Sequence, residues 1–220
     1  ESIIEITGLP RYDLLKSTYT LDEFLNAQKQ QLERIKAGKK LILYAPTFRE
    51  HCGSHLEQIS HSEWHTLNDF MIANNSVLGV RAHPYDLKYA PIFFESLSNI
   101  VWLGQDEFTE SNLVLQYVDA LIVDFSSIWI DYLLLDRPIV GFAKDFEHYR
   151  DDERGFAYDF SSTFPDVFVN NITDLIRQLD LLLSNGMQAK KYSAAKQLFH
   201  AFDISADFSG NLEESIKPYL

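Results

Sequence analysis

The chain has 220 residues, 46% of them hydrophobic, and a formal net charge of −13. An acidic chain without a block of Lys and Arg is atypical of proteins that bind nucleic acid, so no nucleic-acid partner is expected. A single cysteine, Cys52, excludes an internal disulfide and favours a reducing compartment such as the cytoplasm. No stretch reaches the roughly 20 apolar residues of a membrane span, and no signal peptide is visible. The chain opens without Met inside a polar–apolar pattern, so we expect it to be part of a longer protein.

Short apolar runs alternate with helical patterns along the chain. The predicted strands are Leu41–Pro46, Val77–Ala82, Ile100–Leu103, Ala120–Val123 and Ile139–Phe142. They are mostly apolar throughout, as is typical of strands covered on both faces. Predicted helices span residues 21–37, 62–74, 110–117, 127–135, 171–184 and 188–200, whereas 144–170 is the least regular stretch. This alternation predicts an α/β fold with a doubly wound parallel sheet.

Polar residues follow the predicted strands, where an open parallel sheet binds its ligands. Thr47-Phe48-Arg49 follows the first strand, His83-Pro84 the second, Gly104 to Glu107 the third, and Asp124-Phe125-Ser126-Ser127 the fourth. We therefore expect these side chains to gather at one edge of the sheet.

The segment after the fourth strand allows two interpretations. Ser126 or Ser127 can cap the following helix by accepting from its free N–H groups. A helix start with two hydroxyl donors also suits a phosphate, which the helix dipole attracts. The local sequence leaves both interpretations open.

His83 and Arg49 allow functional and structural interpretations as well. Pro84 keeps His83 out of helical geometry, so its ring is presented at the strand end as an acid, a base or a partner of phosphate. The alternative is a hydrogen-bonded structural histidine. Arg49 beside Thr47 suits a phosphate or carboxylate, and the alternative is a surface salt bridge.

Five residues have spacings that can occur in metal sites: His51, Cys52, His55, His61 and His65. Gly53-Ser54 interrupts a helix at the first pair, and nothing completes a ligand set, so no metal is predicted. Arg154 lies in an acidic loop, DDERGF. The glycine-rich motifs of nicotinamide-binding, P-loop and α/β-hydrolase proteins are missing from the sequence.

Four segments together resemble the CDP-glycerol glycerophosphotransferase family, the teichoic acid primases, polymerases and related capsule polymerases. These segments are GLPRYD (8–13), LYAPTFR (43–49), RAHP (81–84) and IVDFSSIWIDYLLLDRPIVGFAKDFEHYRDDERGFAYDF (122–160). The resemblance implies a GT-B fold of two Rossmann-like domains, of which residues 1–220 are the single C-terminal, donor-binding domain. The N-terminal domain is absent from this chain.

The resemblance also implies an activity and its residues. The donor is CDP-glycerol or a related CDP-polyol such as CDP-ribitol, the acceptor is a polyol-phosphate or saccharide chain, and CMP is released without a cofactor. His83 is implied to be catalytic, and Ser126 and Ser127 are implied to hold the pyrophosphate. The complete set of implied substrate-binding residues is Thr47, Arg49, Arg81, Gly104, Asp124, Ser126, Ser127 and Arg154.

The sequence departs from the family in one respect that matters for activity. The family's second histidine lies in a W-H-G-T-like motif of the N-terminal domain, which this chain lacks. We therefore expect the chain to bind donor without turnover, inside the cytoplasm, with any peripheral membrane attachment belonging to the full-length enzyme. Two alternatives remain, a GT-B glycosyltransferase or epimerase domain that uses UDP or GDP, and a non-catalytic binding module.

Overall fold

The computed structural model describes residues 4–49, 55–89, 94, 96–153, 155–185 and 189–220. Within them, six parallel strands form one sheet in the order β3-β2-β1-β4-β5-β6. The strands are β1 (Lys40–Ala45), β2 (Ser76–Val80), β3 (Ile100–Trp102), β4 (Ala120–Val123), β5 (Ile139–Phe142) and β6 (Phe168–Val169). The predicted α/β class and doubly wound parallel sheet are confirmed, and the five predicted strands are present within two residues of their expected ends.

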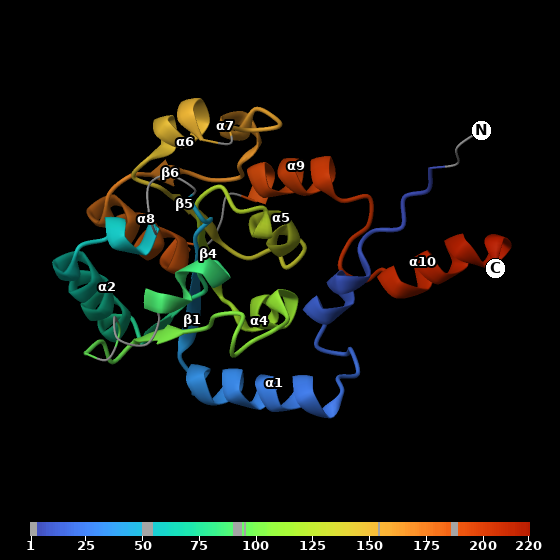
Figure 1. Cartoon of the computed structure of the whole chain (residues 1–220), viewed down its shortest axis with the longest axis horizontal. Helices are drawn as coiled ribbons and strands as arrows, with labels where there is room; N and C mark the ends of the chain where they lie inside the picture. Colours follow the sequence, from blue (N-terminus) through green and yellow to red (C-terminus); the bar gives the residue numbers. More distant parts are fainter. Residues whose placement is uncertain (1–3, 50–54, 90–93, 95, 154, 186–188) are drawn as a thin grey trace.

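Helices connect the strands and flank both faces of the sheet (Figure 1). The α-helices are α1 (Glu23–Lys36), α2 (His61–Ala73), α4 (Ser111–Tyr117), α5 (Ile128–Leu133), α6 (Phe146–Asp152), α7 (Phe160–Thr163), α8 (Ile172–Asn185), α9 (Ala189–Phe199) and α10 (Phe208–Ile216). Short 3-10 helices are η1 (Pro10–Leu15), η2 (His55–Gln58), η3 (Pro84–Tyr89) and η4 (Lys217–Tyr219). In the described part of the chain, no helix combines the length and apolar character that a membrane span requires.

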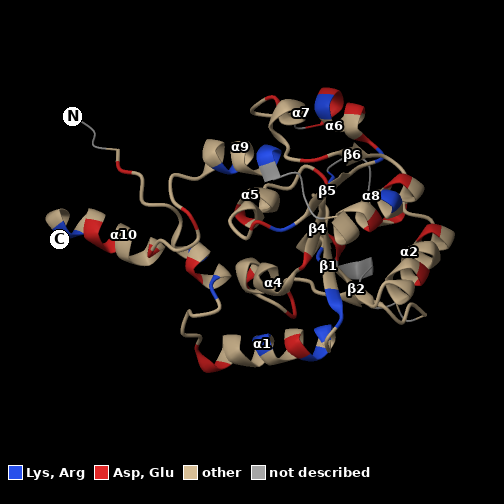
Figure 2. Ribbon diagram, turned by 180° about the vertical axis from the view of Figure 1, so that it is seen from behind, with Lys and Arg blue, Asp and Glu red and all other residues tan. Residues whose placement is uncertain are grey.

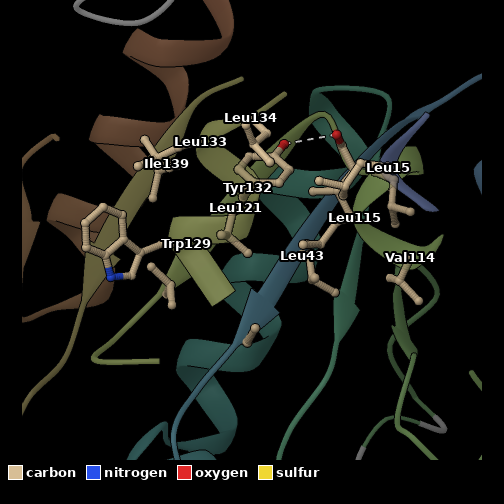
Figure 3. Close-up of a cluster of buried hydrophobic side chains, with 14 of the residues drawn as sticks. Leu15, Leu43, Val114, Leu115, Leu121, Trp129, Tyr132, Leu133, Leu134 and Ile139 are labelled. Atoms are coloured by element: carbon tan, nitrogen blue, oxygen red, sulfur yellow. Dashed lines mark hydrogen bonds between the residues drawn. The ribbon is translucent and has the colours of Figure 1, made fainter. Parts of the chain in front are cut away.

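The apolar strands separate two cores. Leu43 of β1 packs with residues of α1, α4, α5 and α9 on one face, and Figure 3 shows Leu121, Trp129 and Tyr132 in this core. The neighbouring residue Ile42 points to the other face, which α2 and α8 cover. Because successive strand residues alternate between faces, burial of both faces requires the unbroken apolar runs seen in the sequence.

Local capping sets where two of the covering helices begin. Asp22 caps α1 by accepting from the backbone N–H of Leu25 at 2.7 Å. Ser60 and Glu63 form a reciprocal capping box at the start of α2. Such caps satisfy the free N–H groups of the first turn, so they fix the helix starts against the sheet.

The two ends of the described chain lie side by side, away from the sheet (Figure 1). Asp13 of η1 accepts hydrogen bonds from the backbone N–H of Ser209 at 2.9 Å and from its hydroxyl at 2.6 Å. Burial opposes the charge of Asp13, but Lys16 and Ser209 outweigh burial and lower its pKa. Figure 2 shows acidic residues spread over the outer helices together with separate basic ones, in line with the net charge.

Candidate functional site

A pocket of about 830 Å³ lies at the carboxyl ends of β1, β2 and β4. The chain leaves β1 toward β2 on one side and returns through β4 on the other side of β1, so the sheet has its topological switch point here. Open α/β sheets bind ligands at such a switch point. The position of the pocket therefore follows from the strand order.

The structure brings five of the predicted site residues together at this pocket. Thr47, Arg81, His83, Ser126 and Ser127 all line it. Three others, Arg49, Gly104 and Asp124, belong to the surrounding structure and are not among the lining residues. Arg154 lies outside the described residues. Contact of each residue with a ligand stays a prediction.

Asp124 holds the two central turns of the pocket together. Its carboxylate is fully buried and accepts from the Thr47 backbone N–H at 2.8 Å and from the Thr47 hydroxyl at 2.7 Å. It also accepts from the N–H groups of Phe125 and Ser126, at 2.6 and 3.1 Å. The acid at the end of β4 thus joins the turn after β1 to the turn after β4.

Arg49 supports this arrangement from beneath. Its Nη1 lies 2.8 Å from Asp124 Oδ2, and its Nε and Nη2 donate to Asp145 at 2.7 and 3.1 Å. The guanidinium also stacks against the rings of Phe125 and Tyr149, 5.0 and 4.9 Å from their centroids.

Burial disfavours the charge on Arg49, but the hydrogen bond and charge of Asp145, together with Asp124, raise its pKa. The guanidinium is 0% exposed, so the surface salt bridge that the sequence left open is instead a buried one. Arg49 thus supports the turns beside the pocket through Asp124 and the Thr47 carbonyl oxygen.

Ser126 and Ser127 lie where β4 gives way to α5. Ser127 is the residue before α5, but its side chain makes no capping hydrogen bond. Asp124 instead accepts from the Ser126 N–H group. The interpretation of Ser127 as a side-chain cap is therefore wrong, and Ser127 is an exposed residue that lines the pocket.

His83 occupies an exposed position at the pocket mouth. Its Nδ1 accepts from the backbone N–H of Tyr85 at 3.3 Å. Its ring lies 5.3 Å from the Phe48 ring and 5.0 Å from the Tyr85 ring. A neutral ring that accepts at Nδ1 carries its proton on Nε2, so Nε2–H is the group available to donate to a ligand.

Arg81 donates hydrogen bonds to other groups of the protein. Nη1 donates to the carbonyl oxygens of Leu103 and Phe108 at 2.8 and 2.9 Å, and Nη2 donates to the Ser111 hydroxyl at 3.0 Å. Burial lowers the pKa of Arg81 to about 10, so it keeps its charge near neutral pH. Arg81 fixes the loop after β3 against α4 while lining the pocket.

The loop after β3 turns tightly at Gly104 and leaves no room for a side chain there. A Cβ atom on Gly104 would lie 2.2 Å from the indole nitrogen of Trp102 and 2.4 Å from an oxygen of Asp106. Those two groups are hydrogen-bonded to each other at 2.9 Å. The next residue, Gln105, lines the pocket in place of Gly104.

Residues outside the predicted set also line the pocket. They include Arg11, Phe48, Gln105, Asn112 and Tyr149. Arg11 stands in the GLPRYD segment, so the family motif was a signal for it. Asn112 lies inside α4, where its pattern is that of any helical residue, and only the folded chain brings it to the pocket.

His55, His61 and His65, which were considered as metal ligands, are not among the residues that line the pocket. His55 is buried and its Nδ1 is hydrogen-bonded to the Tyr44 hydroxyl. The rings of His61 and His65 are 4.5 Å apart on α2, and His51 and Cys52 lie outside the described residues. Among the residues that the structure describes, no group of three or more His, Cys, Asp or Glu side chains is arranged to hold a metal.

The family model "CDP-Glycerol:Poly(glycerophosphate) glycerophosphotransferase" matches residues 1–206. The chain therefore belongs to this family. A teichoic acid glycerol-phosphate transferase of Staphylococcus aureus is 28% identical over 207 residues, which are 91% of this chain and 49% of the relative. A teichoic acid poly(glycerol phosphate) polymerase of Bacillus spizizenii is 31% identical, over 72% of this chain and 40% of the relative. The chain thus spans about half or less of the length of these relatives.

Solved structures share the fold. The wall teichoic acid polymerase TagF, in a variant soaked with CDPG, superposes with a TM-score of 0.74 at 24% identity, over 98% of this chain and 53% of TagF. A UDP-GlcNAc 2-epimerase of Neisseria meningitidis, bound to UDP-GlcNAc, gives a TM-score of 0.58 at 14% identity, over 97% of this chain and 54% of the epimerase. Both comparisons support the Rossmann-like fold expected of one half of a GT-B protein.

Proposed function

We propose that this chain is the donor-binding part of a polyol-phosphate transferase. It binds CDP-glycerol or a related CDP-polyol, whose polyol phosphate is transferred to a growing teichoic-acid-like or capsular polymer with release of CMP. The observation that carries the proposal is the pocket at the switch point, which unites the APTFR, RAHP and DFSS segments. Membership of the glycerophosphotransferase family supports it.

The lining residues suit the chemistry of this transfer. The acceptor hydroxyl oxygen forms a new bond to the phosphorus that carries the polyol, while the bond from that phosphorus to the bridging oxygen of CMP breaks. The main task of the protein is to stabilise the negative charge on the phosphoryl oxygens in the transition state. The hydroxyls of Ser126 and Ser127 donate to the pyrophosphate, and Nε2–H of His83 donates to the leaving CMP. The base that takes the acceptor's proton is assigned to the N-terminal domain.

The proposal extends to the organisation of the whole enzyme. Residues 1–220 form one Rossmann-like domain, the C-terminal half of a GT-B enzyme, and an N-terminal domain supplies the acceptor site. The relatives' greater length supports this division. The full-length enzyme works in the cytoplasm, with peripheral attachment to the cytoplasmic face of the membrane, where a polymer acceptor is accessible. The isolated chain binds donor without turnover.

Isothermal titration of the chain with CMP, CDP-glycerol, UMP and GMP tests the proposal. We expect the cytidine compounds to bind selectively, and a Ser126→Ala, Ser127→Ala double variant to bind them more weakly. A preference for UMP or GMP would instead indicate a nucleotide-sugar enzyme. Binding of none of the four compounds by a folded chain would favour the non-catalytic module and contradict the proposal.

A further inference from the structure

The pocket must attract an anion although the chain carries a net charge of −13. Arginines are the side chains best suited to phosphate, because their planar fork donates two parallel hydrogen bonds. The arginines that follow β1 and β2 are already paired within the protein, since Arg49 is buried between two carboxylates and Arg81 donates to carbonyl oxygens and Ser111. Arg11, of the GLPRYD segment, lines the pocket with 53% of its side chain exposed.

The guanidinium of Arg11 is oriented by Asp131. Its Nε donates to Asp131 Oδ2 at 2.8 Å, and its Nη2 donates to Oδ1 at 3.0 Å. This side-on pair uses one edge of the guanidinium and leaves the edge formed by Nη1 and Nη2 for a second partner. Asp131 follows Ser127 by four residues, which is about one turn, so Arg11 is held on the side of α5 that also presents the Ser127 hydroxyl.

The segment that carries Arg11 is fixed by two other helices. Asn112 of α4 donates from its amide to the Arg11 carbonyl oxygen at 3.0 Å. Asp13, two residues further on, accepts from the N–H and hydroxyl of Ser209 in α10. The backbone on both sides of the Arg11 side chain is therefore anchored, which lowers the entropy cost of holding a ligand.

We infer that Arg11 binds a phosphate of the donor beside Ser126 and Ser127, with Asp131, Asp13 and Ser209 as positioning residues. This inference rests on the proposed function and adds a ligand-binding residue from outside the sheet. α10 and η1 thereby gain a role in the donor site. The competing explanation is an ion pair that only docks η1 on α5. A pair with only that structural role has little effect on ligand affinity.

Titration of the 220-residue chain with CDP and with cytidine separates these explanations. The variants are Arg11→Gln, Arg11→Lys and the control Arg177→Gln. Arg177 is a suitable control because it is also an exposed arginine paired with an aspartate, at 72% side-chain exposure, and it lies on α8 away from this pocket. Arg11→Gln and Arg177→Gln change the net charge equally. A thermal melt of each variant reports folding.

We expect Arg11→Gln to weaken CDP binding about tenfold or more, the effect of losing charge-assisted hydrogen bonds, and to leave cytidine binding unchanged. Arg11→Lys keeps the charge without the fork and should fall between Arg11→Gln and the wild type. Ser209→Ala should weaken CDP binding less than Arg11→Gln. Arg177→Gln should bind CDP as the wild type does.

Equal CDP affinity for Arg11→Gln and Arg177→Gln would overturn the inference, and so would an equal loss for CDP and cytidine. In both cases CDP binding by the wild-type chain would leave the proposed function standing. If the folded wild-type chain fails to bind CDP, the proposed function and this inference fall together.

Discussion

The floor and the mouth of the pocket are built in opposite ways. What we call the floor is the charged network beneath the lining residues, formed by the buried Asp124 and Arg49 and the half-buried Asp145, which are paired with one another. The mouth carries His83, whose exposed ring accepts from a backbone N–H and lies against two aromatic neighbours. Buried charges fix the shape of the turns, whereas an exposed ring can exchange partners with a ligand. The most strongly paired residue of a motif can therefore lie behind the pocket, while a weakly held one lines it.

The largest stability loss is expected from removing the floor's central acid. Asp124→Ala removes one of the two carboxylates paired with the buried Arg49 and frees the N–H groups of two turns, so the free energy of unfolding should fall by about 3 kcal/mol or more. Urea denaturation measures this. The control is Asp151→Ala, which removes an exposed partner of Arg150 and should change stability little. Similar unfolding curves for the two variants would show that the floor is not a structural network.

Removing His83 from the mouth should lower activity and leave stability unchanged. His83→Ala in the full-length enzyme should lower polyol-phosphate transfer by about 10²–10⁴-fold, because a positioned proton donor is lost, while the urea midpoint stays unchanged. His61→Ala, which removes an exposed histidine of α2, is the control and should keep full activity. Wild-type turnover by His83→Ala would rule out the catalytic assignment.

A smaller effect, on CMP affinity, is expected from changing Ser127. Ser127→Ala removes a hydroxyl that makes no cap, so stability should hold while CMP affinity falls by about tenfold or less. Ser184→Ala, at an exposed position of α8, provides the control. Titration and a thermal melt on the same samples separate the two readouts. Lost stability with unchanged affinity would return Ser127 to a structural role.

The smallest effect concerns the pH dependence of the floor's neighbour, His55. Burial lowers the pKa of His55 below its ordinary value of 6.5. The unfolded chain therefore takes up this proton first as the pH falls below about 6.5, and stability declines by at most about 1.4 kcal/mol per pH unit for one group. His55→Gln should make the slope between pH 7 and pH 5 shallower, whatever its absolute stability. An unchanged slope would mean that His55 does not titrate differently on folding.

The sequence predicted the sheet well because its pattern is local. Side chains of each strand point alternately to two buried faces, so the strands are apolar throughout. This pattern is visible in the sequence alone. Strand β6 escaped prediction because it has two residues, Phe168 and Val169, in an irregular stretch. It is defined by pairing with β5, where Gly141 leaves room for the Phe168 ring. Such a strand depends on its partner more than on its own residues.

The site was predictable in position and less so in the role of each residue. The rule for strand ends placed Thr47, His83 and Ser127 at one pocket, as the structure has them. Whether an arginine is buried or exposed depends on partners far along the chain. Arg49 meets Asp145, 96 residues away, and Arg11 meets Asp131, 120 residues away. Residue type and spacing carry no information about such distant pairs.

The most direct test of the account is a crystal structure of the chain with CDP-glycerol. We expect the pyrophosphate to lie against the hydroxyls of Ser126 and Ser127, and Nε2 of His83 to lie within about 3 Å of a phosphate oxygen. Arg49 should remain paired with Asp124 and Asp145. A nucleotide bound elsewhere on the chain, or a pyrophosphate in contact with Arg49 in place of His83, would rule out this donor site.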